Sequence, residues 1–215
     1  MTLTLYYSPL SCSLVPYIAL TEAGAEFSVK ALNMHRAEHT TAEFRRINPK
    51  QAVPVLLIDG TALTENVAIQ IWIARTFREA HLLPEDPMRE IQAISFLAWC
   101  ASGIHPRLTP NVLPERYCDL PDSAQSVRRC AQTLLRANYA VAEAMLADGR
   151  NWFFEQFTTA DVYFFWCFRR GMQFNVDVAD YPLCRAHFER VSERPSAQRL
   201  FAFEKEVLAR FAENS

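Results

Sequence analysis

The stretch YYSPLSCSLVPYIALTEAG, residues 6–24, establishes how the fold begins. It contains the end of an apolar, β-prone segment (3–7), then the polar turn SPLSCS, and then a segment with a helical pattern (14–24). Pro16 and Gly24 stand where the first turn and the C-cap of a helix favour them. The stretch therefore predicts a strand, a tight turn and a helix in succession, with unpaired N–H groups of the helix start facing the turn.

The rest of the first eighty residues continues this alternation. The elements predicted next are a strand at 26–32, a short helix at 42–48, strands at 53–58 and 62–63, and a helix at 65–77. Asp59-Gly60, between the last two strands, is typical of a hairpin turn. A βαβ unit followed by a ββα unit predicts an α+β domain over residues 1–80, a small mixed sheet with helices on its faces.

Two prolines and a charge cluster interrupt this pattern in HLLPEDP (81–87), which we interpret as an inter-domain linker. Beyond it, apolar residues recur at helical spacing in the segments 89–105, 123–146, 159–172, 184–193 and 196–212. Residues 88–215 are therefore predicted to form an all-α helical bundle. Thr158 and Asp161 have the spacing of a capping box.

Composition argues against several classes of protein. The chain has 215 residues and a formal net charge of −2, without a basic run of the kind that binds nucleic acid. No window approaches the roughly 20 apolar residues of a membrane span, and the N-terminal segment lacks a secretory signal, so we expect a cytoplasmic protein. The six cysteines lack CxxC spacing and neighbouring His clusters, which argues against a zinc site or a disulfide framework.

Cys12 lies in the turn before the first helix, flanked by Ser11 and Ser13. The dipole and the free N–H groups at a helix start favour an anion, so we expect a Cys12 thiolate to be stabilised there. The alternative is a small residue that merely packs in a tight turn.

A second element is NPKQAVPVLLIDG (48–60), in which Pro54 stands at the start of a strand although proline cannot donate to the ladder. A cis peptide bond before Pro54 explains this position and leaves the backbone of Val53 open to a peptide ligand. A proline on an edge strand is the alternative.

A third element is LTENVAIQIWIA (63–74), with Glu65 and Asn66 at the start of a helix. The Glu65 carboxylate suits an ammonium, and the helix N–H groups suit a carboxylate, so the pair fits the amino-acid end of a γ-glutamyl group. Alternatively, these residues are simply favourable at a helix N-terminus.

Together, in this order and at this spacing, the three elements resemble the glutathione transferase superfamily, and SPLSCSLVPYIALTEAG is similar to its bacterial beta class. The resemblance continues through TTADVYFFW (158–166) and ERVSERPSAQRLF (189–201). It implies a thioredoxin-like first domain, a helical second domain, glutathione as co-substrate without a metal, a small hydrophobic electrophile as second substrate, and a homodimer.

The resemblance also implies roles for individual residues. Cys12 is the active-site thiol that faces the glutathione sulfur, with Ser11 or Ser13 as alternative activating groups. His105, in WCASGIHPRLTP, is expected to hydrogen-bond to Cys12 or to glutathione, unless it is a structural histidine.

The implied glutathione-binding residues lie in the three elements and in one further loop. Val53 and the cis Pro54 hold the cysteinyl backbone, and Glu65 and Asn66 hold the γ-glutamyl end. Arg36 stands where the beta class places a Lys near the glycyl carboxylate.

The chain departs from the family at positions that bear on this site. Gln51 and Ala52 stand where relatives often have Gly, and Ala98 replaces an Asn that is common in the beta class. Some glutathione contacts are therefore expected to be lost. Aromatic candidates for the second-substrate pocket, which are otherwise core residues, are Tyr7, Tyr117, Phe165 and Trp166.

The predicted activity is the reaction of glutathione thiolate with an electrophilic carbon or a disulfide. One alternative is a monothiol glutathione-dependent oxidoreductase, since Cys12 can form a mixed disulfide and Val15 stands where a dithiol enzyme has its second Cys. The other is a non-catalytic binding or regulatory protein with a decayed pocket, which Gln51 and Ala98 favour.

Overall fold

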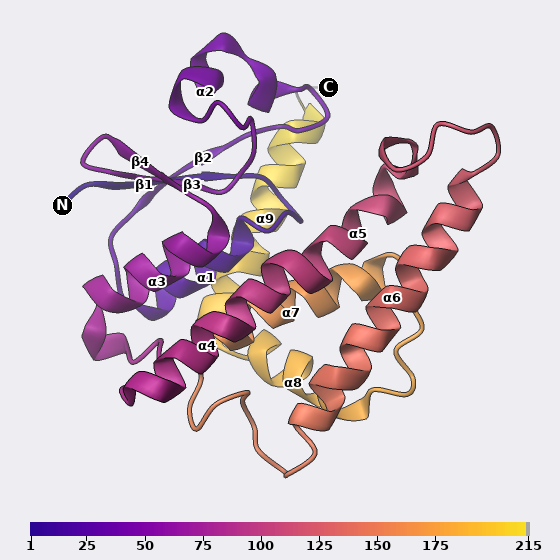
Figure 1. Cartoon of the computed structure of the whole chain (residues 1–215). Helices are drawn as coiled ribbons and strands as arrows, with labels where there is room; N and C mark the ends of the chain where they lie inside the picture. Colours follow the sequence, from indigo (N-terminus) through magenta and orange to yellow (C-terminus); the bar gives the residue numbers. More distant parts are fainter. Residues whose placement is uncertain (214–215) are drawn as a thin grey trace. The chain divides into compact units, whose positions relative to one another are not determined.

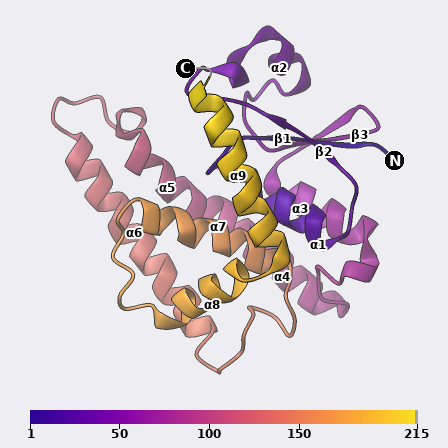
Figure 2. The same cartoon turned by 180° about the vertical axis from the view of Figure 1, so that it is seen from behind.

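A computed structural model of the chain describes residues 1–213, which form two compact units. The first unit contains Met1–Leu83 together with the segment from Glu193 onward, and the second contains Pro84–Ser192. Figures 1 and 2 show their elements from opposite sides. The unit that contains the sheet thus also takes in the last helix. The domain ranges expected from the sequence, 1–80 and 88–215, stay a prediction.

The first unit is built on a mixed sheet. Its strands are β1 (Leu3–Tyr7), β2 (Ser28–Ala31), β3 (Val55–Ile58) and β4 (Thr61–Thr64), and within residues 1–213 they form a four-stranded sheet in the order β2-β1-β3-β4. β1 pairs in parallel with β2 and antiparallel with β3, which pairs antiparallel with β4. The predicted thioredoxin-like βαβ-ββα order is confirmed.

Local sequence explains how these strands are joined. Asp59 and Gly60 have φ angles of 47° and 85°, and positive φ at both central residues suits a type I′ hairpin turn between β3 and β4. The parallel pairing of β1 and β2 needs a crossover, which helix α1 (Leu14–Glu22) supplies. Helices α2 (Ala42–Ile47) and α3 (Asn66–Thr76) complete the predicted set.

Different helices cover the two faces of the sheet. In Figure 1, α1 and α3 lie on one face and α2 lies on the other. On the α2 face, the rings of Tyr6 and Phe44 pack with their centroids 5.4 Å apart. Leu5 and Tyr7, which alternate with Tyr6 along β1, are fully buried on the opposite face. Both faces of β1 are therefore buried, as expected for a central strand.

The last helix, α9 (Pro195–Glu213), packs against α1 within the first unit, and Figure 2 shows the two side by side. The guanidinium of Arg194 donates two hydrogen bonds of 2.7 Å to the carboxylate of Glu22 at the end of α1. Farther along, the rings of Tyr17 and Phe203 stack with their centroids 5.2 Å apart. A bidentate ion pair and an aromatic stack therefore hold α9 in place.

The second unit is helical, as predicted. Its helices are α4 (Pro87–Trp99), α5 (His105–Val112), α6 (Ala124–Met145), α7 (Thr159–Gln173) and α8 (Pro182–Ser192), and a π-helical turn (Cys100–Ile104) joins α4 to α5. Residues 159–168 of α7 are all buried, and α7 contacts the other four helices. A helix that is buried on all sides marks the centre of this unit's core.

The start of α7 has the capping box that the sequence predicted. The N–H of Thr158 donates to Asp161 Oδ2 at 2.8 Å, and the Thr158 side chain accepts from the backbone of Asp161. Asp161 Oδ1 also accepts from the N–H of Phe153 at 3.0 Å and lies 2.9 Å from His187 Nε2. The buried carboxylate therefore joins α7, α8 and the preceding loop.

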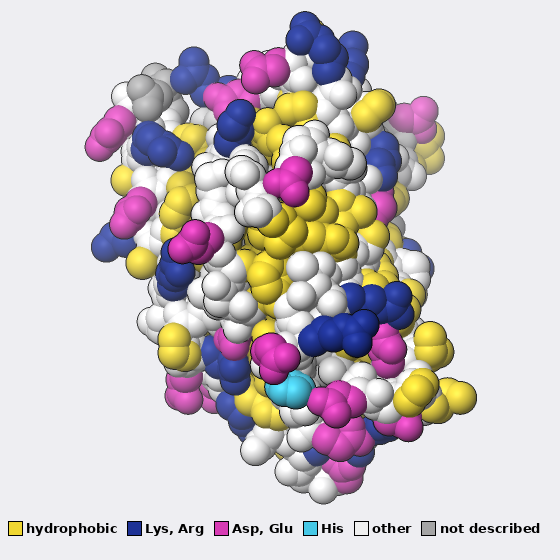
Figure 3. Space-filling model, turned by 90° about the vertical axis from the view of Figure 1, so that its left-hand side faces the viewer, with side chains coloured by type: hydrophobic (Ala, Val, Ile, Leu, Met, Phe, Trp, Pro, Cys, Tyr) yellow, Lys and Arg dark blue, Asp and Glu magenta, His cyan; other side chains and the backbone are white. Residues whose placement is uncertain are grey.

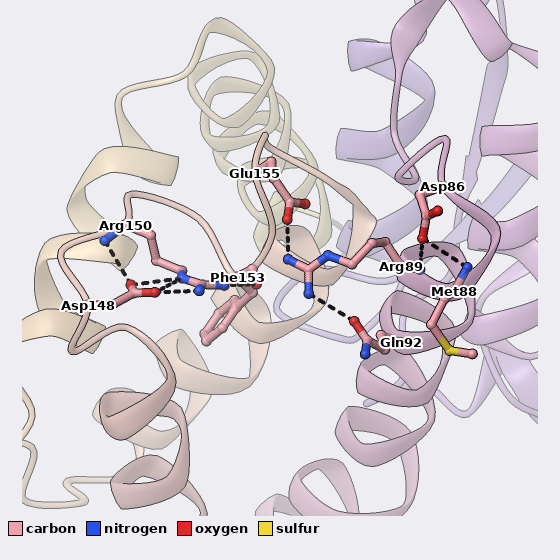
Figure 4. Close-up of polar contacts among 8 residues, drawn as sticks. All are labelled: Asp86, Met88, Arg89, Gln92, Asp148, Arg150, Phe153 and Glu155. Carbon is pink, nitrogen blue, oxygen red and sulfur yellow. Dashed lines mark hydrogen bonds and ion pairs between the residues drawn. The ribbon is translucent and has the colours of Figure 1, made fainter.

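Side-chain contacts also define the start of α4, as Figure 4 shows. Asp86 is the N-cap and accepts from the N–H groups of Met88 at 3.1 Å and Arg89 at 2.9 Å. The Arg89 guanidinium pairs with Glu155 and donates to Gln92 Oε1 at 2.9 Å. These contacts connect the first turn of α4 to the loop that precedes α7.

The surface carries charges of both signs. On the face shown in Figure 3, they surround a group of hydrophobic side chains near its middle. No helix in residues 1–213 combines the length and the apolar character needed to cross a membrane. Within the same residues, no group of three or more His, Cys, Asp or Glu side chains is placed to hold a metal ion.

Candidate active site

Three serines organise the turn between β1 and α1. The N–H of Ser8 donates to Ser13 Oγ at 2.9 Å, and Ser11 Oγ donates to the carbonyl oxygen of Ser8 at 2.8 Å. The hydroxyls of Ser11 and Ser13 lie 2.6 Å apart, and Ser13 is fully buried. Both hydroxyls therefore have partners within the turn. Their role in activating a sulfur atom stays a prediction.

Cys12 directs its thiol toward the loop before β3. Its S–H donates to the carbonyl oxygen of Val53, with the two atoms 3.5 Å apart. Desolvation raises the pKa of Cys12 to about 12, and hydrogen bonds from its own backbone and from Asn66 offset only part of this effect. The residue as a whole keeps partial exposure, although nearby protein atoms desolvate the thiol.

The expected stabilisation of a Cys12 thiolate by the helix start is therefore wrong. The first N–H groups of α1, those of Leu14 and Val15, donate to the carbonyl oxygens of Ser11 and Cys12 at 3.2 Å. Because the backbone of the turn satisfies these N–H groups, desolvation outweighs the helix dipole at the sulfur atom. The raised pKa disfavours the Cys12 thiolate near pH 7.

The peptide bond between Val53 and Pro54 is cis, which confirms the prediction. The carbonyl oxygen of Val53 accepts the hydrogen bond from Cys12. The N–H of Val53 has no hydrogen-bond partner among residues 1–213. One donor of this backbone is therefore available to a ligand.

Helix α3 begins beside the same turn. Asn66 is 6% exposed, and its Nδ2 donates to the carbonyl oxygen of Cys12 at 2.8 Å. Its Oδ1 is buried without a partner in the described part of the chain. Glu65 precedes it with a φ of 71°, and its carboxylate pairs with the ammonium of Lys50, which also donates to Thr64 Oγ1 at 2.9 Å. Lys50 is a partner of Glu65 that the sequence analysis did not assign.

Gln51 follows this lysine in a left-handed conformation, with a φ of 54°. Glycine adopts such a φ without a steric penalty. The loop keeps this conformation here with Gln.

Arg36 lies in the turn that follows β2. The N–H groups of His35 and Arg36 donate to Asn33 Oδ1 at 3.0 and 3.3 Å, an Asx-type turn that orders this segment. A contact between the Arg36 guanidinium and a glycyl carboxylate stays a prediction.

His105 is the first residue of α5, directly after the π-helical turn. Its Nδ1 lies 3.1 Å from the hydroxyl of Tyr163, and its ring packs edge-on against Trp166 with the centroids 4.4 Å apart. This hydroxyl partner and the aromatic contact together orient the ring. π-helical turns are frequent at functional sites, but a contact of His105 with Cys12 or glutathione stays a prediction.

The four aromatic candidates for a pocket wall differ in exposure. Tyr7, Phe165 and Trp166 are buried, and the ring of Phe165 stacks on Phe188 with the centroids 5.2 Å apart. Tyr117 is 52% exposed. Burial favours the alternative interpretation, core packing, for the first three residues.

Glu204, on α9, belongs to the turn that carries Cys12, and the sequence analysis missed it. Its Oε1 accepts from the hydroxyl of Tyr7 at 3.2 Å and from the N–H of Leu10 at 2.8 Å. A signal was present, because Glu204 shares the helical spacing of Leu200 and Val207, which are both buried. A carboxylate on the apolar face of a helix indicates a buried partner.

Comparison with known proteins agrees with the fold described above. The family model for the glutathione S-transferase N-terminal domain matches residues 1–75. Glutathione S-transferase GstA of Escherichia coli O157:H7 is 32% identical over 198 residues, which cover 90% of this chain and 94% of that protein. Maleylpyruvate and maleylacetoacetate isomerases are also among the similar proteins.

Solved structures agree as well. A glutathione transferase homologue from Sulfitobacter with bound glutathione has a TM-score of 0.87 at 27% identity, over 94% of this chain and 97% of that chain. The beta class glutathione S-transferase of Sphingomonas chungbukensis has a TM-score of 0.82 at 30% identity, over 94% and 98%. Similarity over nearly the whole length, in sequence and in fold, shows that the chain belongs to the glutathione S-transferase family, close to its bacterial beta class.

Proposed function

We propose that the chain is a glutathione transferase that conjugates glutathione with a small hydrophobic electrophile. The observation that carries this proposal is the convergence of three separate sequence elements on Cys12. The thiol of Cys12 contacts the Val53 carbonyl, and the Asn66 side chain contacts the Cys12 carbonyl. In the first unit, a thiol, an unpaired backbone N–H and the N-terminus of a helix therefore lie close enough together to contact one small ligand.

Glutathione fits this place in an extended pose. The N–H of Val53 takes the carbonyl oxygen of its cysteinyl residue, as in strand pairing. Glu65 and the start of α3 hold the ammonium and the carboxylate of the γ-glutamyl end, with Lys50 as a second charge beside them. Arg36 takes the glycyl carboxylate.

In this proposal the raised pKa of Cys12 favours conjugation over disulfide chemistry. In this proposal the S–H of Cys12 turns from the Val53 carbonyl oxygen to the glutathione thiolate, and Cys12 itself is a poor nucleophile. The glutathione sulfur forms a bond to the electrophilic carbon, and the leaving group departs with the electron pair of the broken bond. The proton of the glutathione thiol passes to solvent, and His105 stays a candidate for a hydrogen bond to Cys12 or to glutathione.

Thiol–disulfide exchange is the second candidate function. The position of Cys12, beside the site proposed for the glutathione sulfur, favours it. The Cys12 thiolate attacks a glutathionylated disulfide, forms a mixed disulfide with glutathione and releases the other thiolate. A second glutathione thiolate then attacks the mixed disulfide, which yields glutathione disulfide and regenerates Cys12. This route needs the thiolate that desolvation disfavours.

Binding and turnover test the proposal together. We expect retention on immobilised glutathione, turnover of 1-chloro-2,4-dinitrobenzene, and a loss of turnover of about tenfold in Cys12→Ala. Cys130→Ala, which changes an exposed cysteine on α6, is the matched control. Disulfide exchange that is lost in Cys12→Ala while aryl conjugation persists assigns the chain to the second candidate. Absence of both binding and turnover supports the non-catalytic alternative.

We also propose that the protein is a homodimer. Helix α6 carries exposed apolar side chains in a stripe at helical spacing, Leu134, Val141 and Met145. Such a stripe suits burial against a second copy. Val141→Glu is expected to shift the sedimentation coefficient toward the monomer, and Ala140→Glu, on an exposed position beside the stripe, is the control. A dimer that persists in Val141→Glu contradicts this surface.

The cysteines support a reducing compartment for this reaction. None of the six, which all lie within residues 1–213, forms a disulfide bond. Free thiols are usual in the cytosol, where glutathione is maintained in its reduced form. We therefore place the reaction in the cytoplasm, with removal of reactive electrophiles as its purpose.

A further inference from the structure

Glu204 joins the last helix of the chain to the turn that carries Cys12. The residue is 4% exposed, on the face of α9 that packs into the first unit. Its Oε1 accepts from two donors, the Tyr7 hydroxyl at 3.2 Å and the Leu10 N–H at 2.8 Å. Tyr7 is the last residue of β1, and Leu10 lies two residues before Cys12. The carboxylate thus holds both the end of the strand and the middle of the turn.

The turn depends on the Glu204 carboxylate because the backbone conformation at Leu10 is unfavourable. Leu10 has a φ of 62°, in the left-handed region that a leucine rarely adopts. Its N–H points away from the hydrogen bonds of the serine turn and into the first unit, where Glu204 receives it. A partly buried N–H without an acceptor is destabilising, so loss of the carboxylate removes a main reason for this conformation.

The carboxylate is itself held in place. The ring of Phe203, the residue before it, packs against Tyr7 and Tyr17 with centroid distances of 5.5 and 5.2 Å. At the start of the helix, Arg194 is paired with Glu22 through two hydrogen bonds of 2.7 Å. The anchor therefore lies on a rigid element, which is what precise placement of a reactive group requires.

We propose that Glu204 is a positioning residue of the active site: by holding Tyr7 and the Leu10 peptide, it places the Cys12 thiol beside Val53. This inference deepens the proposed function and rests on it for the role of Cys12 toward glutathione. A residue of α9, which lies outside the three sequence elements, thereby takes part in the site.

Two substitutions of Glu204 are expected to differ in their effect on KM. Glu204→Ala removes the acceptor, and we expect the KM for glutathione to rise about tenfold with a smaller change in kcat. Glu204→Gln keeps a side-chain oxygen that can accept from Leu10, and we expect a KM within about threefold of wild type. Glu206→Ala, on an exposed position of the same helix, is the matched control and is expected to leave KM unchanged.

A second readout does not require glutathione. In full-length protein, iodoacetamide labelling of Cys12 is followed against pH by peptide mass spectrometry. If the turn loosens in Glu204→Ala, water reaches the thiol and the labelling profile shifts to lower pH, while Glu204→Gln and Glu206→Ala keep the wild-type profile. If Glu204 only stabilises the fold, Glu204→Ala lowers the unfolding temperature and leaves the labelling profile of Cys12 unchanged.

The outcomes are separable. A folded Glu204→Ala protein with wild-type KM and labelling profile overturns the inference. If Glu204→Ala does not fold, Tyr7→Phe, which removes one donor and keeps the core volume, decides: a shifted labelling profile supports the inference and an unchanged one overturns it. If wild-type protein binds no glutathione, the proposed function fails, and labelling alone still tests whether Glu204 positions Cys12.

Discussion

The side-chain amide of Asn66 donates a hydrogen bond of 2.8 Å to the carbonyl oxygen of Cys12, and it thereby connects the start of α3 to the turn before α1. The two residues are 54 positions apart in the chain. The bond directly links the element that carries Cys12 to the element that we propose to bind the γ-glutamyl end of glutathione.

Substitution of Asn66 by Asp removes the donor and keeps the size of the side chain. We expect the free energy of unfolding to fall by about 1–3 kcal/mol, because the Cys12 carbonyl loses its donor and a carboxylate is buried in its place. We also expect the pKa of Cys12 to rise further, since the Asn66 hydrogen bond lowers it. Urea unfolding measures the first effect. Asn151→Asp, on an exposed position, is the control, and equal losses in both variants contradict the prediction.

Thiol labelling should distinguish Cys12 from Cys118 within one protein. Hydrogen bonds from Ser123 and from the Leu120 backbone lower the pKa of Cys118, whereas desolvation raises that of Cys12 to about 12. A lowered pKa gives more thiolate at neutral pH, so Cys118 should react first with iodoacetamide near pH 7.

Labelling of Cys12 should instead keep rising with pH, about tenfold per unit up to roughly pH 11, because its thiolate fraction grows until the pKa is reached. Time-resolved peptide mass spectrometry measures both residues together. A Cys12 rate that levels off near pH 8 would show that its thiolate is stabilised after all.

Glu22 should contribute stability that disappears in acid. Desolvation raises its pKa, but hydrogen bonds from Arg194 and Ser196 lower it more, so its pKa is below the ordinary value of 4.5. A lowered pKa means that this stability is present above pH 4.5 and is lost as the pH falls through the lowered value. We expect Glu22→Gln to unfold about 1–3 kcal/mol more easily than wild type at pH 7 and to approach wild type in strong acid.

Chemical denaturation at a series of pH values measures this difference. Glu26→Gln changes an exposed carboxylate close to the same helix and is the matched control. A stability difference for Glu22→Gln that does not depend on pH would argue that packing, and not the ion pair, holds α9 against α1.

Gln70 should be replaceable by an apolar residue of similar shape. It is fully buried on α3, one turn after Asn66, and neither its Oε1 nor its Nε2 has a partner among residues 1–213. A buried amide without hydrogen bonds is destabilising, so Gln70→Met should raise the free energy of unfolding by about 1 kcal/mol or more. Gln125→Met, at an exposed position on α6, is the control. A loss of stability in Gln70→Met would instead indicate an ordered water bound to the amide.

Much of the fold could be predicted from local sequence. The hairpin at Asp59-Gly60, the capping box at Thr158 and Asp161, and the helix start at Pro16 each depend on the conformational preferences of a few adjacent residues. Such preferences act within one or two turns of chain, so a single sequence displays them. The cis bond before Pro54 was predictable for the same reason.

Of the candidate site, only the residues that compose it could be predicted. Cys12, Val53 and Asn66 were named from motifs, and the structure joins them through hydrogen bonds of the predicted elements. The raised pKa of Cys12 could not be predicted, because the helix dipole acts locally, whereas desolvation depends on the fold around the thiol. Lys50, the partner of Glu65, was not assigned, since no local pattern connects the two residues.

By itself, the sequence determined the order of the strands and of most helices, although not α5, together with the turns and the side chains that carry chemistry, because backbone preferences and side-chain types are properties of short segments. Only the tertiary structure decided that α9 returns to the first unit, that Glu204 supports the turn of Cys12, and that burial raises the pKa of this thiol. These features arise from burial and from contacts between residues far apart in the chain, and the free energy of such contacts exists only once the chain has folded.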